Sequence, residues 1–146
     1  MSPAPTALIA LILYALWAML LVLSIAAVRV HQVLTGAAEL NEFTAGVPHG
    51  QPGYWRLNRA HMNAMENLPI FATVVLTGWV ADAVSPAFNA LAVIVLVARA
   101  SQSLIHIASE SRAAVGLRFG AFAVQIVCEF WMAWLILASF GLFPVH

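Results

Sequence analysis

Charged and amide side chains are concentrated at residues 56–66, at the start of an otherwise apolar segment. Arg56, Arg59, Asn63 and Glu66 recur every three or four residues, so a helix of 3.6 residues per turn places them on one stripe. The apolar run 67–81 that follows has about 15 residues, fewer than the roughly 20 that cross a hydrocarbon core. If this helix crosses a membrane, Glu66 and Asn63 are drawn to membrane depth. A charge there is costly and normally faces a bundle interior or a wet cavity, so the stripe is a candidate ligand site.

A second polar stripe interrupts a later apolar segment. Arg99, Gln102 and His106 are spaced i, i+3, i+7 and therefore share one helix face. A turn signal at residues 85–86 separates this segment from the first. Counted from that turn, His106 and Glu66 are each about 20 residues away, or roughly 30 Å of helix. The two stripes are therefore expected at similar depth, near the same membrane face.

The cations of the chain are all arginines, and most of them fall near these stripes. A guanidinium offers a planar fork that suits carboxylate or phosphate, and it stays charged when partly buried. Several arginines around Glu66 leave an excess of positive charge, which favours an anionic ligand. A structural alternative is that Glu66 pairs with Arg99 and the stripes only hold helices together. The cations expected at this end are Arg29, Arg56, Arg59, Arg99 and Arg118.

The overall composition indicates an integral membrane protein. Of the 146 residues, 63% are hydrophobic and 8% are charged, against about 25% charged in soluble domains. The formal net charge is zero and there is no basic tract, so we expect no nucleic-acid partner. The single cysteine, Cys128, excludes an intrachain disulfide and a multi-cysteine metal site, and no Cys/His zinc spacing occurs, so we expect no metal.

The hydropathy pattern predicts an all-α fold, an integral membrane four-helix bundle that forms a single domain over residues 1–146. The arginine-bearing loops should share one side of the membrane, and the positive-inside rule assigns that side to the cytoplasm. Both termini and the turn at 85–86 should lie on the opposite side. The helices are expected at about 7–33, 55–83, 86–108 and 117–143.

Fixed residue types in the second and third segments resemble a known family. The pattern RAHxNxxExxP at 59–69, followed by VAR at 97–99, resembles the signature of the MAPEG family. These are the membrane-associated proteins of eicosanoid and glutathione metabolism. The chain length and the four spans agree with this resemblance. It implies a homotrimer that binds glutathione, as cosubstrate, between neighbouring subunits near the cytoplasmic face.

The resemblance also implies roles for individual residues. Arg118, at the head of the fourth segment, would lie beside the glutathione sulfur as the catalytic residue. The preceding loop aligns only with a small gap, so Arg112 is the alternative. Gln102 and His106 stand where the eicosanoid enzymes usually carry tyrosines. The glutathione contacts implied by position are Arg29, Arg59, His61, Asn63, Glu66, Arg99, Gln102 and His106.

The chemistry that follows is thiolate attack. A thiol of pKa about 8.5 is mostly protonated at neutral pH, and a nearby fixed cation favours the reactive thiolate. We therefore expect a glutathione transferase or peroxidase that acts on lipophilic electrophiles or hydroperoxides arriving from the bilayer lipids. One alternative is a non-catalytic lipid- or glutathione-binding protein on the same scaffold. Another is a small proton-coupled transporter that uses Glu66 and Glu129 as proton sites.

Overall fold

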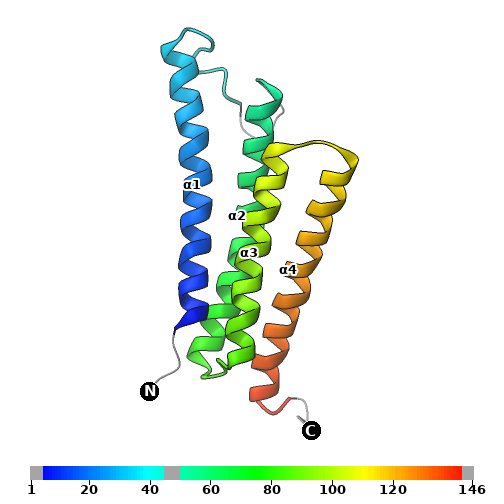
Figure 1. Ribbon diagram of the computed structural model, residues 1–146. Coiled ribbons are helices and arrows are strands. Elements are labelled where there is room, and N and C mark those ends of the chain that lie inside the picture. Colours follow the sequence, from blue (N-terminus) through cyan, green and yellow to red (C-terminus); the bar gives the residue numbers. More distant parts are fainter. Residues whose placement is uncertain (1–4, 45–49, 143–146) are drawn as a thin grey trace.

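The fold is an all-α bundle of four long helices (Figure 1). The computed structural model describes residues 5–44 and 50–142, and within these ranges it contains no strand. The helices run up and down along one axis, and the turn between the second and third lies at the same end as the start of the first and the end of the fourth. This is the topology predicted from the hydropathy pattern. The elements are α1 (Thr6–Leu34), α2 (Pro52–Val80), α3 (Pro86–Ala108) and α4 (Arg112–Ser139).

The outer surface of the bundle is apolar along most of its length. Three helices, α1, α3 and α4, are long and apolar enough to cross a membrane. Large hydrophobic side chains such as Leu23, Phe130 and Trp131 are more than half exposed, and such a surface requires lipid rather than water around it. The chain is therefore an integral membrane protein. Although α2 has 29 residues, it is not among the three apolar spans, because its first half carries the polar stripe.

Two helices begin earlier than the sequence predicted. α2 begins at Pro52 rather than near 55, because a proline in the first turn has no N–H that needs a partner. α4 begins at Arg112 rather than near 117, because the Ser111 hydroxyl caps the helix by accepting from the Ala114 N–H at 3.2 Å. The polar loop expected before α4 therefore shrinks to residues 109–111.

The same two helices also end earlier than predicted, at Val80 and Ser139 instead of near 83 and 143. Asp82 after α2 has a φ of 51°, and Gly141 after α4 has a φ of 73°. Both values lie in the left-handed region, which stops an α-helix. The predicted end of the fourth helix, Phe143, lies outside the described residues. By contrast, the bounds of α1 and α3 agree with the prediction to within one residue.

The helices do not all touch one another. α2 and α3 form the centre, α1 packs against both, and α4 packs against both, but no contact joins α1 to α4 within the described residues. Small side chains such as Ala10, Ala64 and Ala92 are fully buried and allow close approach of the backbones. Because α4 packs against α2 and α3 but not against α1, a pocket that involves α4 must lie between these three helices.

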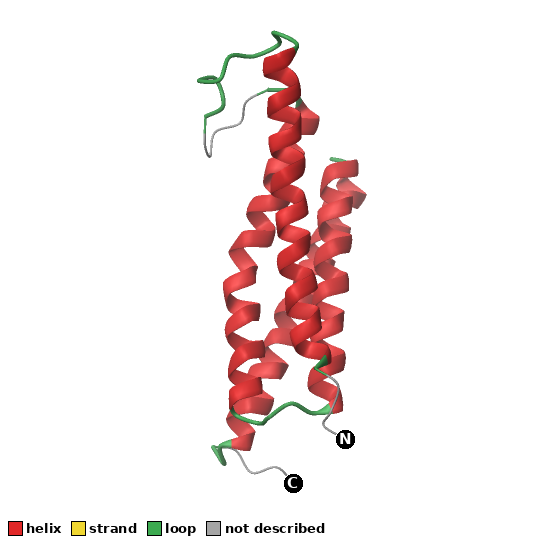
Figure 2. Cartoon of the chain, turned by 90° about the vertical axis from the view of Figure 1, so that its left-hand side faces the viewer, coloured by secondary structure: helices red, strands yellow, loops and turns green. Residues whose placement is uncertain are grey.

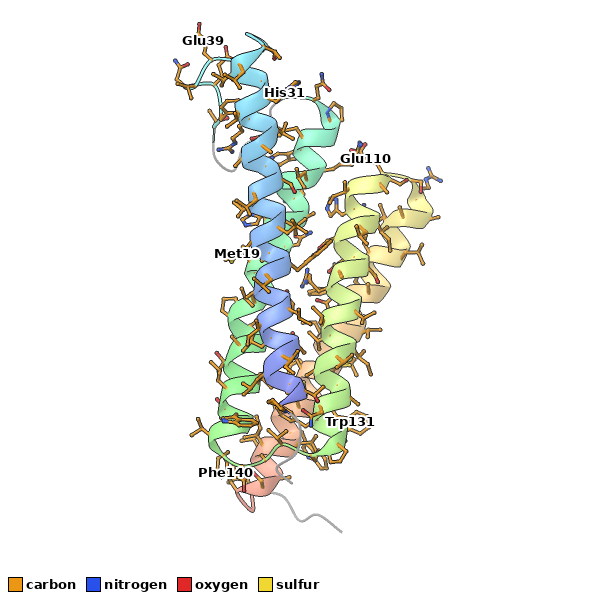
Figure 3. All side chains as sticks on the ribbon, turned by 60° about the vertical axis from the view of Figure 1, so that its left-hand side comes forward. Met19, His31, Glu39, Glu110, Trp131 and Phe140 are labelled. Atoms are coloured by element: carbon orange, nitrogen blue, oxygen red, sulfur yellow. The ribbon has the colours of Figure 1, made fainter. Side chains whose placement is uncertain are left out.

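The loop-bearing ends of α1 and α2 project beyond the connection between α3 and α4 (Figure 2). Figure 3 shows His31 and Glu39 on this projecting end, Glu110 at the top of α3, and Phe140 at the opposite end of the bundle. The connection between α1 and α2 and the connection between α3 and α4 thus lie at the same end of the molecule.

Candidate functional site

A pocket of about 490 Å³ lies between α2, α3 and α4. One wall is polar and comes from the two stripes together with the head of α4. The other wall is apolar and comes mainly from α4. The predicted site residues that line the pocket are Asn63, Glu66, Arg99, Gln102, His106 and Arg118. The remaining lining residues are Asn67, Ile70, Val115, Phe119, Phe122 and Ile126.

Arg99 is the most deeply buried charged residue that lines the pocket. It is only 1% exposed, and its Nη1 donates to Gln102 Oε1 at 2.8 Å. Its guanidinium carbon also lies 5.9 Å from the centre of the Tyr14 ring, a cation–π distance. The Arg99 Nε is buried and has no hydrogen-bond partner among the described residues. A buried N–H of this kind is costly unless a ligand or water accepts from it, so the pocket is suited to an anion.

Gln102 links the polar wall to the head of α4. Its Nε2 donates to the Arg118 carbonyl at 3.2 Å, while its Oε1 accepts from both Arg99 and Gln125. The side chain is therefore engaged within the protein at both ends of its amide. This bond fixes the backbone of α4 at Arg118 against α3. The Arg118 side chain lines the pocket at the turn where α4 enters the bundle.

The structure separates the two arginines that were alternatives for the head of α4. Arg118 lines the pocket, whereas Arg112 is exposed at the first position of the helix and does not. The difference follows from the early start of α4, since a helix that begins at Arg112 carries Arg118 almost two turns into the bundle.

Three of the predicted contact residues do not line the pocket of their own chain. Arg59 is exposed and His61 is partly buried on the same stretch of α2. The Arg29 Nε donates to the Tyr54 hydroxyl at 2.7 Å, and its guanidinium lies 5.2 Å from the Phe43 ring. These contacts hold Arg29 on the projecting end of α1 and α2, away from the pocket.

The structural alternative for Glu66 is not found. Glu66 is exposed at the mouth of the pocket and makes no ion pair with Arg99. Within residues 5–44 and 50–142, the one ion pair joins Arg56 to Glu110 at 3.3 Å. The Arg56 Nε also donates to the Ile107 carbonyl at 2.9 Å, so this arginine caps the end of α3.

One polar lining residue was not singled out by the sequence analysis. Asn67 is 4% exposed, and its Nδ2 donates to Glu129 Oε1 at 2.7 Å. Asn67 follows Asn63 by four residues, so helical spacing puts both on one face. This spacing is the feature of the sequence from which Asn67 could have been predicted as a site residue. No group of three metal-ligating side chains occurs in the part of the chain that the structure describes.

These features define a class of protein, the membrane-embedded helical bundles whose pocket combines arginines with apolar side chains. Comparison with protein-family models makes this class specific. The model of the MAPEG family matches residues 7–138, nearly the whole chain, and the chain belongs to this family. The resemblance drawn from the motifs is thereby confirmed. No curated protein matches the chain.

Proposed function

We propose that this protein is a glutathione-dependent transferase or peroxidase of the membrane, in which Arg118 stabilises the glutathione thiolate. The observation that carries the proposal is the composition of the pocket. Two arginines, a carboxylate and two asparagines face the same space as a wall of apolar side chains. A peptide with charged ends and a lipophilic acceptor can therefore lie side by side in it.

The polar wall fits the groups of glutathione, which has two carboxylates, one amine, two amides and a thiol. Arg99 has a buried Nε without a partner in the described chain and would donate to a carboxylate. Glu66 would accept from the ammonium group. Asn63 would pair with a peptide amide. Arg118 would then lie beside the sulfur and lower the pKa of the thiol.

The apolar wall supports a lipophilic acceptor. Phe119 and Phe122 lie on the outer side of α4 and are 71% and 42% exposed, so the wall is continuous with the lipid-facing surface. In the transferase reaction the thiolate sulfur would bond to the electrophilic carbon, and the leaving group would depart with the electron pair of the broken bond. Arg118 would hold the thiolate until attack, which is electrostatic stabilisation of the nucleophile.

The proposal includes a homotrimer with its arginine-bearing end in the cytoplasm. Arg29, Arg59 and His61 do not line the pocket of their own chain. Assembly of three copies would allow them to complete the pocket of a neighbour. The orientation rests on the arginines in the helix ends that flank the two connections at the pocket end, and on the positive-inside rule.

Replacement of the two α4 arginines tests the proposal. Arg118→Ala should lower the rate of glutathione conjugation to a lipophilic aryl halide by about a hundredfold, the usual effect of removing one preorganised charge donor. It should also return the pH titration of bound glutathione thiol toward that of free thiol. Arg112→Ala is the matched control and should leave both unchanged. Full activity and an unaltered titration in Arg118→Ala would contradict the proposed role.

One observation favours a second candidate, a binding protein without catalysis. The Gln102 amide stands at a position where the eicosanoid enzymes usually carry a tyrosine hydroxyl, and it is engaged at both ends within the protein. It therefore offers the ligand no acidic proton. Saturable glutathione binding without turnover of any electrophile or hydroperoxide would support this candidate.

A further inference from the structure

A carboxylate is buried in the middle of α4, below the pocket. Glu129 is 3% exposed, and its Oε1 accepts from the Asn67 Nδ2 at 2.7 Å. Its Oε2 is buried and has no hydrogen-bond partner among the described residues. An ionisable group inside a membrane bundle is costly unless another charge compensates it, so this position requires an explanation.

A chain of buried amides leads from Glu129 to the pocket floor. Asn67 Nδ2 donates weakly to Gln125 Oε1 at 3.5 Å, and Gln125 Nε2 donates to Gln102 Oε1 at 3.1 Å. The same oxygen of Gln102 accepts from Arg99 Nη1 at 2.8 Å. The three amides are at most 7% exposed. A cation therefore stands at one end of a continuous buried path across α2, α3 and α4, and a carboxylate stands at the other.

Neither end has a direct partner of opposite charge. Arg99 makes no ion pair within the described ranges, although its side chain is 1% exposed. Glu129 makes none there either; its burial favours the neutral acid, whereas the bond from Asn67 and the Arg99 guanidinium favour the carboxylate. Two opposite charges that are buried in the same network and have no nearer partner stabilise each other, because screening in the bundle interior is weak.

We propose that Glu129 is the counter-charge of Arg99 and a positioning residue of the pocket. While the pocket is empty, Glu129 compensates the buried guanidinium through Asn67, Gln125 and Gln102. An anionic ligand bound above Arg99 takes over part of that compensation. Glu129 therefore limits the affinity of the pocket for anions and keeps Arg99 stable when no ligand is present.

The charge pairing is tested without any ligand, by thermal unfolding of the detergent-purified protein. Glu129→Gln keeps the shape and the bond to Asn67 but removes the charge, and Arg99→Met removes the guanidinium. Each should lower Tm by about 5 °C or more, because each leaves one buried charge uncompensated. The double variant should recover at least about half of the summed loss. Additive losses would overturn the pairing.

A neighbouring residue supplies the matched control. Cys128 is buried next to Glu129, and Cys128→Ser adds a polar change without altering the charge. Its effect should add to that of Arg99→Met. If Glu129→Gln cannot be purified, recovery of folded protein in the double variant supports the pairing, and loss of both variants overturns it. Glu129→Asp, which keeps the charge, should fall between the wild type and Glu129→Gln in Tm.

Ligand affinity distinguishes an electrostatic role of Glu129 at the pocket from a purely structural role in the bundle. This test rests on the proposed function. Glutathione titrated by calorimetry should bind Glu129→Gln about threefold more tightly than the wild type, because one nearby negative charge is gone. A purely structural role predicts equal or weaker binding, and that result would overturn the positioning role. Absence of binding to both proteins would contradict the proposed function, whereas the non-additive stability would still support the charge pair.

Discussion

Gly78→Ala should destabilise the bundle where α2 packs against the Phe88 ring of α3. An ideal Cβ at residue 78 would lie 2.5 Å from Phe88 Cζ and 2.9 Å from its Cε2. Carbon atoms attract best at about 3.5–4.0 Å, so the ring or the helix must move by roughly 1 Å. The Phe88 ring is fully buried, and buried side chains are close-packed, so the ring cannot shift without moving its neighbours. Overpacking of this kind costs about 1–3 kcal/mol, while alanine returns about 0.5–1 kcal/mol of helix propensity.

The net expected loss is about 1 kcal/mol of unfolding free energy, the middle of the difference between these two ranges, which corresponds to a fall in Tm of about 2–4 °C for a chain of this size. Thermal unfolding of the purified protein in one detergent measures it. Gly120→Ala in α4 is the control, because an added Cβ there meets nothing within 4 Å among the described atoms. Its Tm should stay equal or rise slightly. If Gly78→Ala were as stable as Gly120→Ala, the packing of α2 on α3 would be wrong.

Three further changes test other contacts. Tyr14→Phe removes a buried hydroxyl that donates to a backbone carbonyl at 3.1 Å, so unfolding free energy should fall by about 1 kcal/mol, and an unchanged Tm would refute that bond. Glu110→Gln removes an exposed ion-pair partner and should change Tm by less than about 2 °C; a larger fall would mean that the pair carries more than a surface contact. Ser111→Ala removes the cap of α4 and should cost about 1 kcal/mol, measured in the same unfolding assay, with Ser139→Ala at the far end as a milder control.

The bundle and the polar wall could be predicted from the sequence for a simple reason. Helical spacing alone decides that Arg99, Gln102 and His106 share a face, and the distance to the turn at 85–86 decides that Glu66 lies at the same depth. Apolar run lengths decide the number of helices. These inferences need no knowledge of how one helix is rotated against another.

The remaining features depend on that rotation and on contacts between distant segments. Arg29 lies beside Tyr54 and outside the pocket of its own chain, because the rotation of α1 against α2 depends on how their buried side chains pack. The role of Asn67 depends on Glu129, which is 62 residues away. The early start of α4 depends on one capping residue, Ser111, which the sequence analysis placed inside the loop before the helix.

The most direct test of the central claim is glutathione binding to the detergent-purified protein by calorimetry. The wild type should bind saturably. Glu66→Gln and Arg99→Met should each weaken binding at least about tenfold, since each loses a charge-assisted contact, and Arg112→Ala should bind like the wild type. Binding that is the same in all four proteins, or that is absent from the wild type at millimolar glutathione, would contradict the assignment of the pocket between α2, α3 and α4 as the glutathione site.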